Sequence, residues 1–137
     1  NEVRELSTAE LEEKLAEIFA PADAATTRED VEALVSSDFC SAYVKLISLI
    51  QQQYPDAKIV CIIGDAVSMG MQKAIMAIAN HYGAKYVDLL SVNGFNDQTY
   101  MPKHDFDGTK EICHPNAKAM RFIANKIYED CGAWLEE

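Results

Sequence analysis

The run Lys58-Ile59-Val60-Cys61-Ile62-Ile63-Gly64 decides the fold class of this chain. It is apolar from Ile59 to Ile63, rich in β-branched residues, and does not alternate with polar residues. Such a run is typical of a strand in a parallel sheet that helices cover on both faces. We therefore expect an α/β protein with this strand near its centre.

Helices are predicted on either side of this strand. Ser7-Thr8-Ala9-Glu10 has the pattern of a capping box, and apolar residues at helical spacing follow to about residue 20, where Pro21 is expected to break the helix. A second helical stretch begins near Thr27, with an interruption at residues 36–38, and ends near residue 53. Another helix is predicted from about residue 67 to 82, with Gly83 as its stop.

The rest of the chain predicts a short strand at residues 85–90, an irregular connection at 91–113 and a last helix. That helix is expected to begin with Pro115 at its first position and to end near Gly132. This order predicts one α/β domain over residues 1–137 with a mostly parallel sheet. Ligands of such sheets bind at the carboxyl ends of the strands, so the loops after Gly64 and Leu90 are the expected site.

The composition makes several classes of function less favourable. The formal net charge of −10 disfavours binding to nucleic acid or to an anionic membrane surface. No apolar run approaches the roughly 20 residues of a membrane-spanning helix. None of the four cysteines forms a close Cys-x-x-Cys pair, so neither a zinc knuckle nor a redox motif is expected. Cys61 is predicted to be buried, one disulfide among the other cysteines remains open, and the compartment stays undetermined.

Catalytic chemistry is expected at His114, which directly precedes Pro115. The positive end of a helix dipole favours a neutral imidazole there, and a neutral imidazole can act as a general base. Glu111 is close enough along the chain to hold the other ring nitrogen. From these residues alone, a surface histidine beside a solvated acid is an equal alternative.

A family resemblance favours the catalytic interpretation. The segment Glu111-Ile112-Cys113-His114-Pro115-Asn116, followed by a helix rich in alanine and isoleucine, resembles the final block of SGNH-type (GDSL-like) ester hydrolases. Residues 54–60 and 79–89 are also similar to this family, and the resemblance covers about residues 39–131. It implies a three-layer α/β/α, flavodoxin-like fold and a serine acyl transfer that needs no metal or organic cofactor. The implied substrate is a small-molecule acyl or acetyl ester, with a carbohydrate-linked ester as one candidate.

The resemblance also assigns roles to individual residues. It implies that His114 is the general base and then acid, and that Glu111 orients it, although the family usually has Asp at that position. Asp105 and Asp107 are nearby substitutes for the acid. Asn1-Glu2 is similar to the end of the family's Gly-x-Asn-Asp block, which makes Asn1 the expected oxyanion-hole residue.

The family's nucleophile block, Gly-Asp-Ser, does not occur in these residues. In Gly64-Asp65-Ala66-Val67-Ser68 an alanine stands at the serine position, and Ser68 is better explained as a helix-start hydroxyl than as a nucleophile. We therefore expect the C-terminal part of an SGNH-like domain, incomplete at its N-terminus and inactive alone. Such a piece is expected to form a homodimer or to need the missing N-terminal segment.

Three other interpretations are kept. The chain could be a non-catalytic α/β binding or assembly module. His81 is expected to cap a helix end. A metal site is a weaker hypothesis because its candidates fall short of a full calcium loop; they are His104, Asp105, Asp107, Glu111 and Cys113.

Overall fold

The computed structural model describes residues 3–64, 67–92, 103–105, 111–113 and 115–137. They form a mixed α/β and mostly helical structure with a small two-stranded parallel sheet. The chain divides into two compact units, which are described separately below. The first comprises Asn1–Cys61 with Val67–Tyr86, and the second comprises Ile62–Ala66 with Val87–Glu137. The expectation of one domain over the whole chain stays a prediction.

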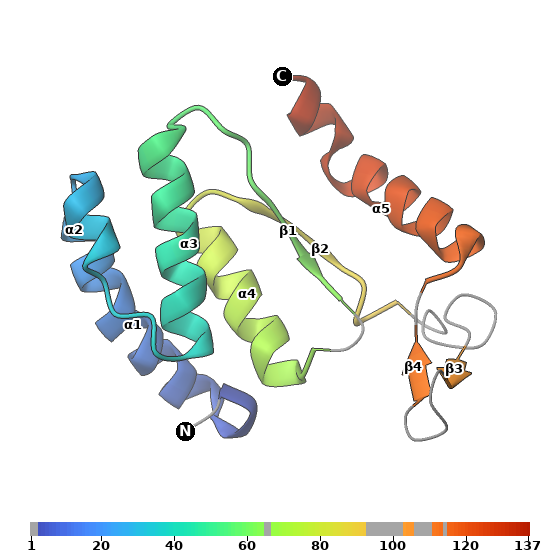
Figure 1. Cartoon of the computed structure of the whole chain (residues 1–137), viewed down its shortest axis with the longest axis horizontal. Helices are drawn as coiled ribbons and strands as arrows, with labels where there is room; N and C mark the ends of the chain where they lie inside the picture. The colour runs from blue at the N-terminus through green and yellow to red at the C-terminus, as the bar shows by residue number, and fades with distance from the viewer. Residues whose placement is uncertain (1–2, 65–66, 93–102, 106–110, 114) are drawn as a thin grey trace. The chain divides into compact units, whose positions relative to one another are not determined.

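Helices make up most of the first unit. They are the 3-10 helix η1 (Val3–Glu5) and the α-helices α1 (Thr8–Ala24), α2 (Arg28–Glu32), α3 (Phe39–Gln53) and α4 (Met69–His81). Helix α3 packs against α1, α2 and α4, and α1 also contacts α4 (Figure 1). Apolar side chains of these helices are buried: Leu11, Leu15, Val31, Val44, Ile47, Ile75 and Ile78. Burial of such side chains from water is the main stabilising contribution of a packed helical layer.

The predicted start of α1 is confirmed, and its predicted end is wrong. Ser7 Oγ accepts a hydrogen bond from the Glu10 amide, and the Glu10 carboxylate accepts one from the Ser7 amide. The helix continues through Pro21 to Ala24. Proline removes one amide donor but fixes a φ that is compatible with a helix, and Ala22, which follows it, is buried.

Both ends of α4 are defined by local chemistry. Ser68 caps the helix by accepting from the Met71 amide at 3.2 Å, which confirms its interpretation as a helix-start hydroxyl. Gly83 adopts a φ of 68° and confirms the predicted stop. The amides of Gly83 and Ala84 donate to the carbonyls of Asn80 and Ala79, the pattern of a Schellman motif.

The predicted central strand is present as β1 (Val60–Ile63), and it pairs with β2 (Lys85–Asp88). Lys85 N donates to Ile59 O at 3.0 Å and Leu89 N donates to Ile63 O at 2.9 Å, a constant offset that identifies a parallel pair. Cys61 and Ile63 are buried, whereas Ile62 is 42% exposed. The uniform burial expected along this strand is therefore not observed.

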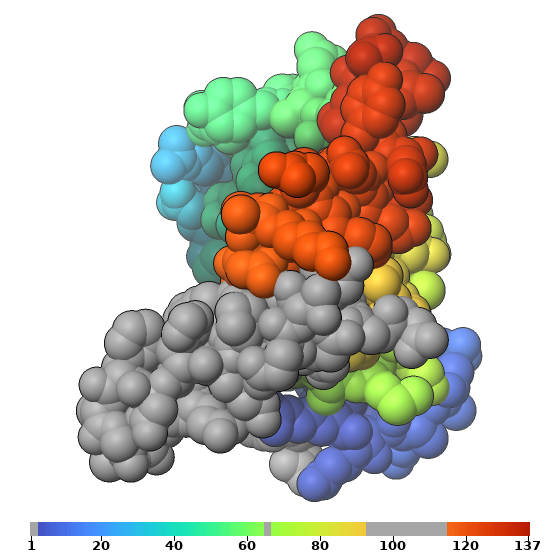
Figure 2. Space-filling view, turned by 90° about the vertical axis from the view of Figure 1, so that its right-hand side faces the viewer, coloured from blue at the N-terminus to red at the C-terminus, as the bar shows by residue number. Residues whose placement is uncertain are grey.

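The second unit corrects two expectations. Within the span predicted to be irregular, β3 (Lys103–Asp105) pairs antiparallel with β4 (Glu111–Cys113). Helix α5 (Ala117–Glu136), drawn from orange to red in Figure 2, has Asn116 as its N-cap and runs through Gly132. Pro115 therefore precedes the cap instead of opening the helix. Among the described residues only Gly83 has the left-handed φ of a helix stop, and Gly132 remains within α5.

Three of the four cysteines are buried and form no disulfide: Cys40, Cys61 and Cys131. The predicted burial of Cys61 is thus confirmed. The fourth, Cys113, lies in β4, and its side chain is outside the described residues. Within the described ranges, no helix has the length and apolar character needed to cross a membrane.

Candidate functional site

The site begins where η1 lies against the first turn of α4. A Cβ added to Gly70 would collide with the carbonyl oxygen of Val3 and lie 3.0 Å from the Val3 carbonyl carbon and 3.1 Å from Arg4 Cα. These are backbone atoms, which cannot move aside as a side chain can. Glycine at this position therefore allows the two backbones to touch, and Val3, 6% exposed, is held in place two residues after Asn1.

A cavity of about 360 Å³ adjoins this contact. It opens among η1, α1, α4 and the start of α3, and its lining includes Val3, Arg4, Lys14, Phe39, Cys40 and Met71. The volume and the mixture of apolar and polar groups are in the usual range for a small-molecule pocket, roughly 300–1,000 Å³.

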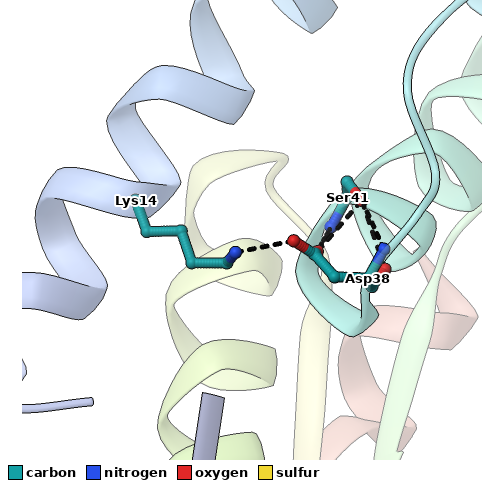
Figure 3. A network of polar contacts seen from close by, with 3 residues as sticks. All are labelled: Lys14, Asp38 and Ser41. Carbon is teal, nitrogen blue, oxygen red and sulfur yellow. Dashed lines mark hydrogen bonds and ion pairs between the residues drawn. The ribbon is translucent and has the colours of Figure 1, made fainter. Parts of the chain in front are cut away.

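A network of polar contacts holds one wall of this cavity (Figure 3). Lys14 Nζ on α1 lies 2.6 Å from Asp38 Oδ2. The other carboxylate oxygen of Asp38 accepts from the Ser41 amide at 2.9 Å and from the Ser41 hydroxyl at 3.0 Å. The Asp38 amide in turn donates to Ser41 Oγ at 3.2 Å, which makes a reciprocal cap at the start of α3. One carboxylate therefore both caps α3 and ties it to α1.

Both members of this ion pair are charged at neutral pH. Partial burial raises the pKa of Asp38, but the hydrogen bonds from Lys14 and Ser41 outweigh it, and the pKa lies below its ordinary value. The hydrogen bond to Asp38 raises the pKa of Lys14. The two charges compensate each other, so Lys14 is not an unpaired cation available for a substrate anion.

Cys40 is the thiol nearest to this network and is fully buried. Burial, and next the negative charge of Asp38, raise the pKa of the Cys40 thiol. Because the thiolate is the nucleophilic form, this environment disfavours Cys40 as a nucleophile.

The predicted catalytic residues are described only in part. Asn1 and His114 lie outside the described residues, and so does Asp107. Glu111 begins β4, where its backbone is opposite Asp105 of β3, so the two candidate acids occupy one cross-strand position. The same register places His104 opposite Ile112.

Two further predictions concern His81 and a metal site. His81 is the last residue of α4, at the helix end where it was expected. Its Nε2 lies 2.8 Å from Asp23 Oδ2, and its ring stacks on Phe19 with centroids 3.8 Å apart. The side chains of the metal-site candidates, His104, Asp105, Asp107, Glu111 and Cys113, lie outside the described part of the chain, so the metal site stays a prediction.

Sequence reasoning missed two features of this site. Asp38 lies in the predicted interruption at residues 36–38, yet Asp at position 38 and Ser at position 41 have the spacing of a reciprocal cap. No local sequence pattern predicts the role of Gly70, because the η1 residues that it contacts are distant in sequence. Only the three-dimensional contact explains why a glycine occupies the first turn of α4.

The comparisons with known proteins give one match. A family described as GDSL-like Lipase/Acylhydrolase matches residues 21–131. No curated protein and no solved structure gives a significant match.

Proposed function

This chain belongs to the GDSL-like lipase/acylhydrolase family, and from this premise we propose that it supplies the histidine and the acid of a serine ester hydrolase. The proposed substrate is a small acyl ester, with acetyl esters of carbohydrates as one class. The observation that carries the proposal is the family match, which extends over Glu111, His114 and the start of α5. The complete domain is proposed to have the three-layer α/β/α fold.

The proposed mechanism is acyl transfer. His114 takes the proton of the attacking serine hydroxyl and later gives it to the leaving alcohol, while Glu111 orients the imidazole. Support comes from the chain order, because β4 ends at Cys113 and the N-cap of α5 is Asn116. The Asn116 side chain accepts from the Ala119 amide at 2.9 Å, so the helix that follows His114 is well capped. Its positive dipole end would keep the resting imidazole neutral.

Asn1 is proposed to donate to the oxyanion of the tetrahedral intermediate. The contact between η1 and α4 supports this role because it fixes Val3, which follows Asn1 closely in the chain. An oxyanion donor requires a rigid support of this kind, because the donor stabilises the transition state only if it is in position before the charge develops.

The nucleophile is proposed to come from outside these 137 residues, because they contain no Gly-Asp-Ser block and Ser68 caps α4. A fluorophosphonate probe, which labels activated serines, tests this directly. We expect neither the 137-residue protein nor its Ser68→Ala variant to be labelled. Labelling that disappears in Ser68→Ala would assign the nucleophile to Ser68 and overturn this part of the proposal.

The roles of the histidine and the acid are tested in the complete protein that includes the serine. With 4-nitrophenyl acetate, His114→Ala should lower kcat roughly 10⁴- to 10⁶-fold while the circular dichroism spectrum stays unchanged. Glu111→Gln should lower kcat far more than its matched control Asp105→Asn. The opposite ranking would assign the acid to Asp105. Unchanged turnover in His114→Ala, or no ester hydrolysis by the complete protein, would overturn the esterase proposal in favour of a binding or assembly module.

A further inference from the structure

Helix α5 of the second unit carries apolar side chains on two of its sides. One side includes Ala119 and Cys131, which are buried. The other side is open to solvent: Met120 is 56% exposed, Tyr128 67% and Leu135 42%. Exposed apolar residues at helical spacing indicate a contact surface. We call this surface the outer stripe, and its residues are Ala117, Met120, Ala124, Tyr128 and Leu135.

Large and small residues alternate along the outer stripe. A groove of about 390 Å³ follows its C-terminal half. The groove is lined by Ala124, Ile127, Tyr128, Gly132, Leu135 and Glu136. Gly132 lets the Tyr128 ring lie close to the helix backbone, because a Cβ at this position would be 3.0 Å from the ring. A helix surface of this kind can interlock with the surface of a second helix.

We propose that the outer stripe binds the outer stripe of a second copy of this chain. The two α5 helices are antiparallel, with a two-fold axis at the level of Lys126. In such a symmetric contact, residues equally far from position 126 on its two sides lie opposite each other. Each large residue then faces a small residue of the second copy; the pairs are Leu135 with Ala117, Tyr128 with Ala124, and Met120 with Gly132. Because the Tyr128 ring lies beside Gly132, the Met120 sulfur also meets an aromatic ring, which is a favourable contact.

The charges beside the outer stripe support the antiparallel direction. Lys118 and Arg121 are exposed beside its N-terminal half, and Glu129 and Glu136 are exposed beside its C-terminal half. In the antiparallel pair, Arg121 of one copy and Glu129 of the other are within about 3 Å of the same level along the helix axis. A parallel pair would bring like charges together instead. The net charge of −10 also repels an anionic lipid surface, so a second copy is the favoured occupant.

The size of the contact determines its expected strength. The outer stripe extends from Ala117 to Leu135, about 27 Å along the helix axis. One helix face of this length buries less than the roughly 800 Å² per partner of a standard interface. We therefore expect a reversible dimer with a Kd of roughly 1–100 μM.

The test is analytical ultracentrifugation of the 137-residue protein from about 1 μM to 1 mM, in about 0.15 M NaCl to screen the net charge. The mass should rise from that of one chain to that of two. Ala124→Glu should raise Kd at least about tenfold, because it places a charge between two apolar surfaces. Ala133→Glu is the matched control: Ala133 is also exposed on α5 but lies outside the outer stripe, so the same added charge should leave Kd unchanged. Circular dichroism should show the same helix content in both variants.

A charge exchange tests the antiparallel direction. Arg121→Glu should raise Kd about tenfold, because two ion pairs of the dimer become repulsive contacts. Adding Glu129→Arg should restore the wild-type Kd. This restoration cannot arise within one helix, because the two positions are about 12 Å apart along its axis.

Three results would overturn the proposal. They are the mass of one chain at every concentration, an equal Kd for Ala124→Glu and Ala133→Glu, and no restoration by the double exchange. The first result would overturn it even if the outer stripe bound lipid vesicles or another protein. No ester is hydrolysed in these experiments, so their outcome is independent of the esterase proposal.

Discussion

Replacement of Gly70 by alanine tests the contact between η1 and α4. The added methyl group would overlap the backbone of Val3, so η1 must either shift or leave α4. Detachment exposes the buried Val3 side chain, which costs about 1.5–3 kcal/mol. Alanine favours the helix over glycine by up to about 1 kcal/mol, and less in the first turn, where Gly70 lies. We therefore expect Gly70→Ala to lower the free energy of unfolding by about 1–2 kcal/mol.

The assay is equilibrium unfolding in urea, with Gly64→Ala as the matched control. A Cβ at Gly64 meets no atom within 4 Å, and Gly64 does not have a positive φ. Gly64→Ala should therefore leave the free energy of unfolding unchanged or raise it by about 0.4–1 kcal/mol, because alanine reduces the entropy of the unfolded chain. If Gly70→Ala proves as stable as Gly64→Ala, η1 does not depend on this contact. If Asn1 is the oxyanion donor, as proposed, a shifted η1 should also lower kcat beyond the loss of folded protein in a protein that includes the serine, because Asn1 lies two residues before η1 in the chain.

Two further substitutions test the charge network and α5. The carboxylate of Asp38 has a lowered pKa, so the stability it contributes is present above its ordinary value of 3.8 and is lost as the pH falls through the lower folded value. Below about pH 4 the wild type should thus lose stability more steeply than Asp38→Asn. The difference should be at most about 1 kcal/mol, because the ion pair is partly exposed. Urea midpoints of the two proteins that change in parallel from about pH 3 to 7 would contradict this. Gly132→Ala should raise the free energy of unfolding by up to about 1 kcal/mol, because the nearest obstacle is the Tyr128 ring at 3.0 Å, an exposed side chain that can move. A lower Tm for this variant would show that the Tyr128 ring is held in place.

Local signals in the sequence predicted three helix boundaries correctly. The cap at Ser7, the cap at Ser68 and the stop at Gly83 each depend on residues within one helical turn, so their chemistry can be read from neighbouring letters. The run around Val60 was long and apolar enough to identify β1. Family membership, inferred from the segment around His114, is likewise confirmed by the family match.

Errors arose where distant parts of the chain decide the outcome. Pro21 and Gly132 carry helix-breaking propensity, yet α1 and α5 continue through them. The pairing of β3 with β4 depends on backbone hydrogen bonds between short strands, too short to produce a hydrophobic period. The roles of Gly70 and Lys14 require contacts between separate helices, which no local pattern encodes. The roles of Asn1, Glu111 and His114 stay predictions.

The buried cysteines also allow local opening of the structure to be measured. Cys40 on α3 and Cys131 on α5 are almost inaccessible, so a thiol reagent can reach them only when the surrounding structure opens. Cys40 belongs to the first compact unit and Cys131 to the second. Reaction rates measured separately at these two sulfur atoms would therefore report the opening free energy of each unit. Different opening free energies are expected if the two units open independently, and equal ones if they open together.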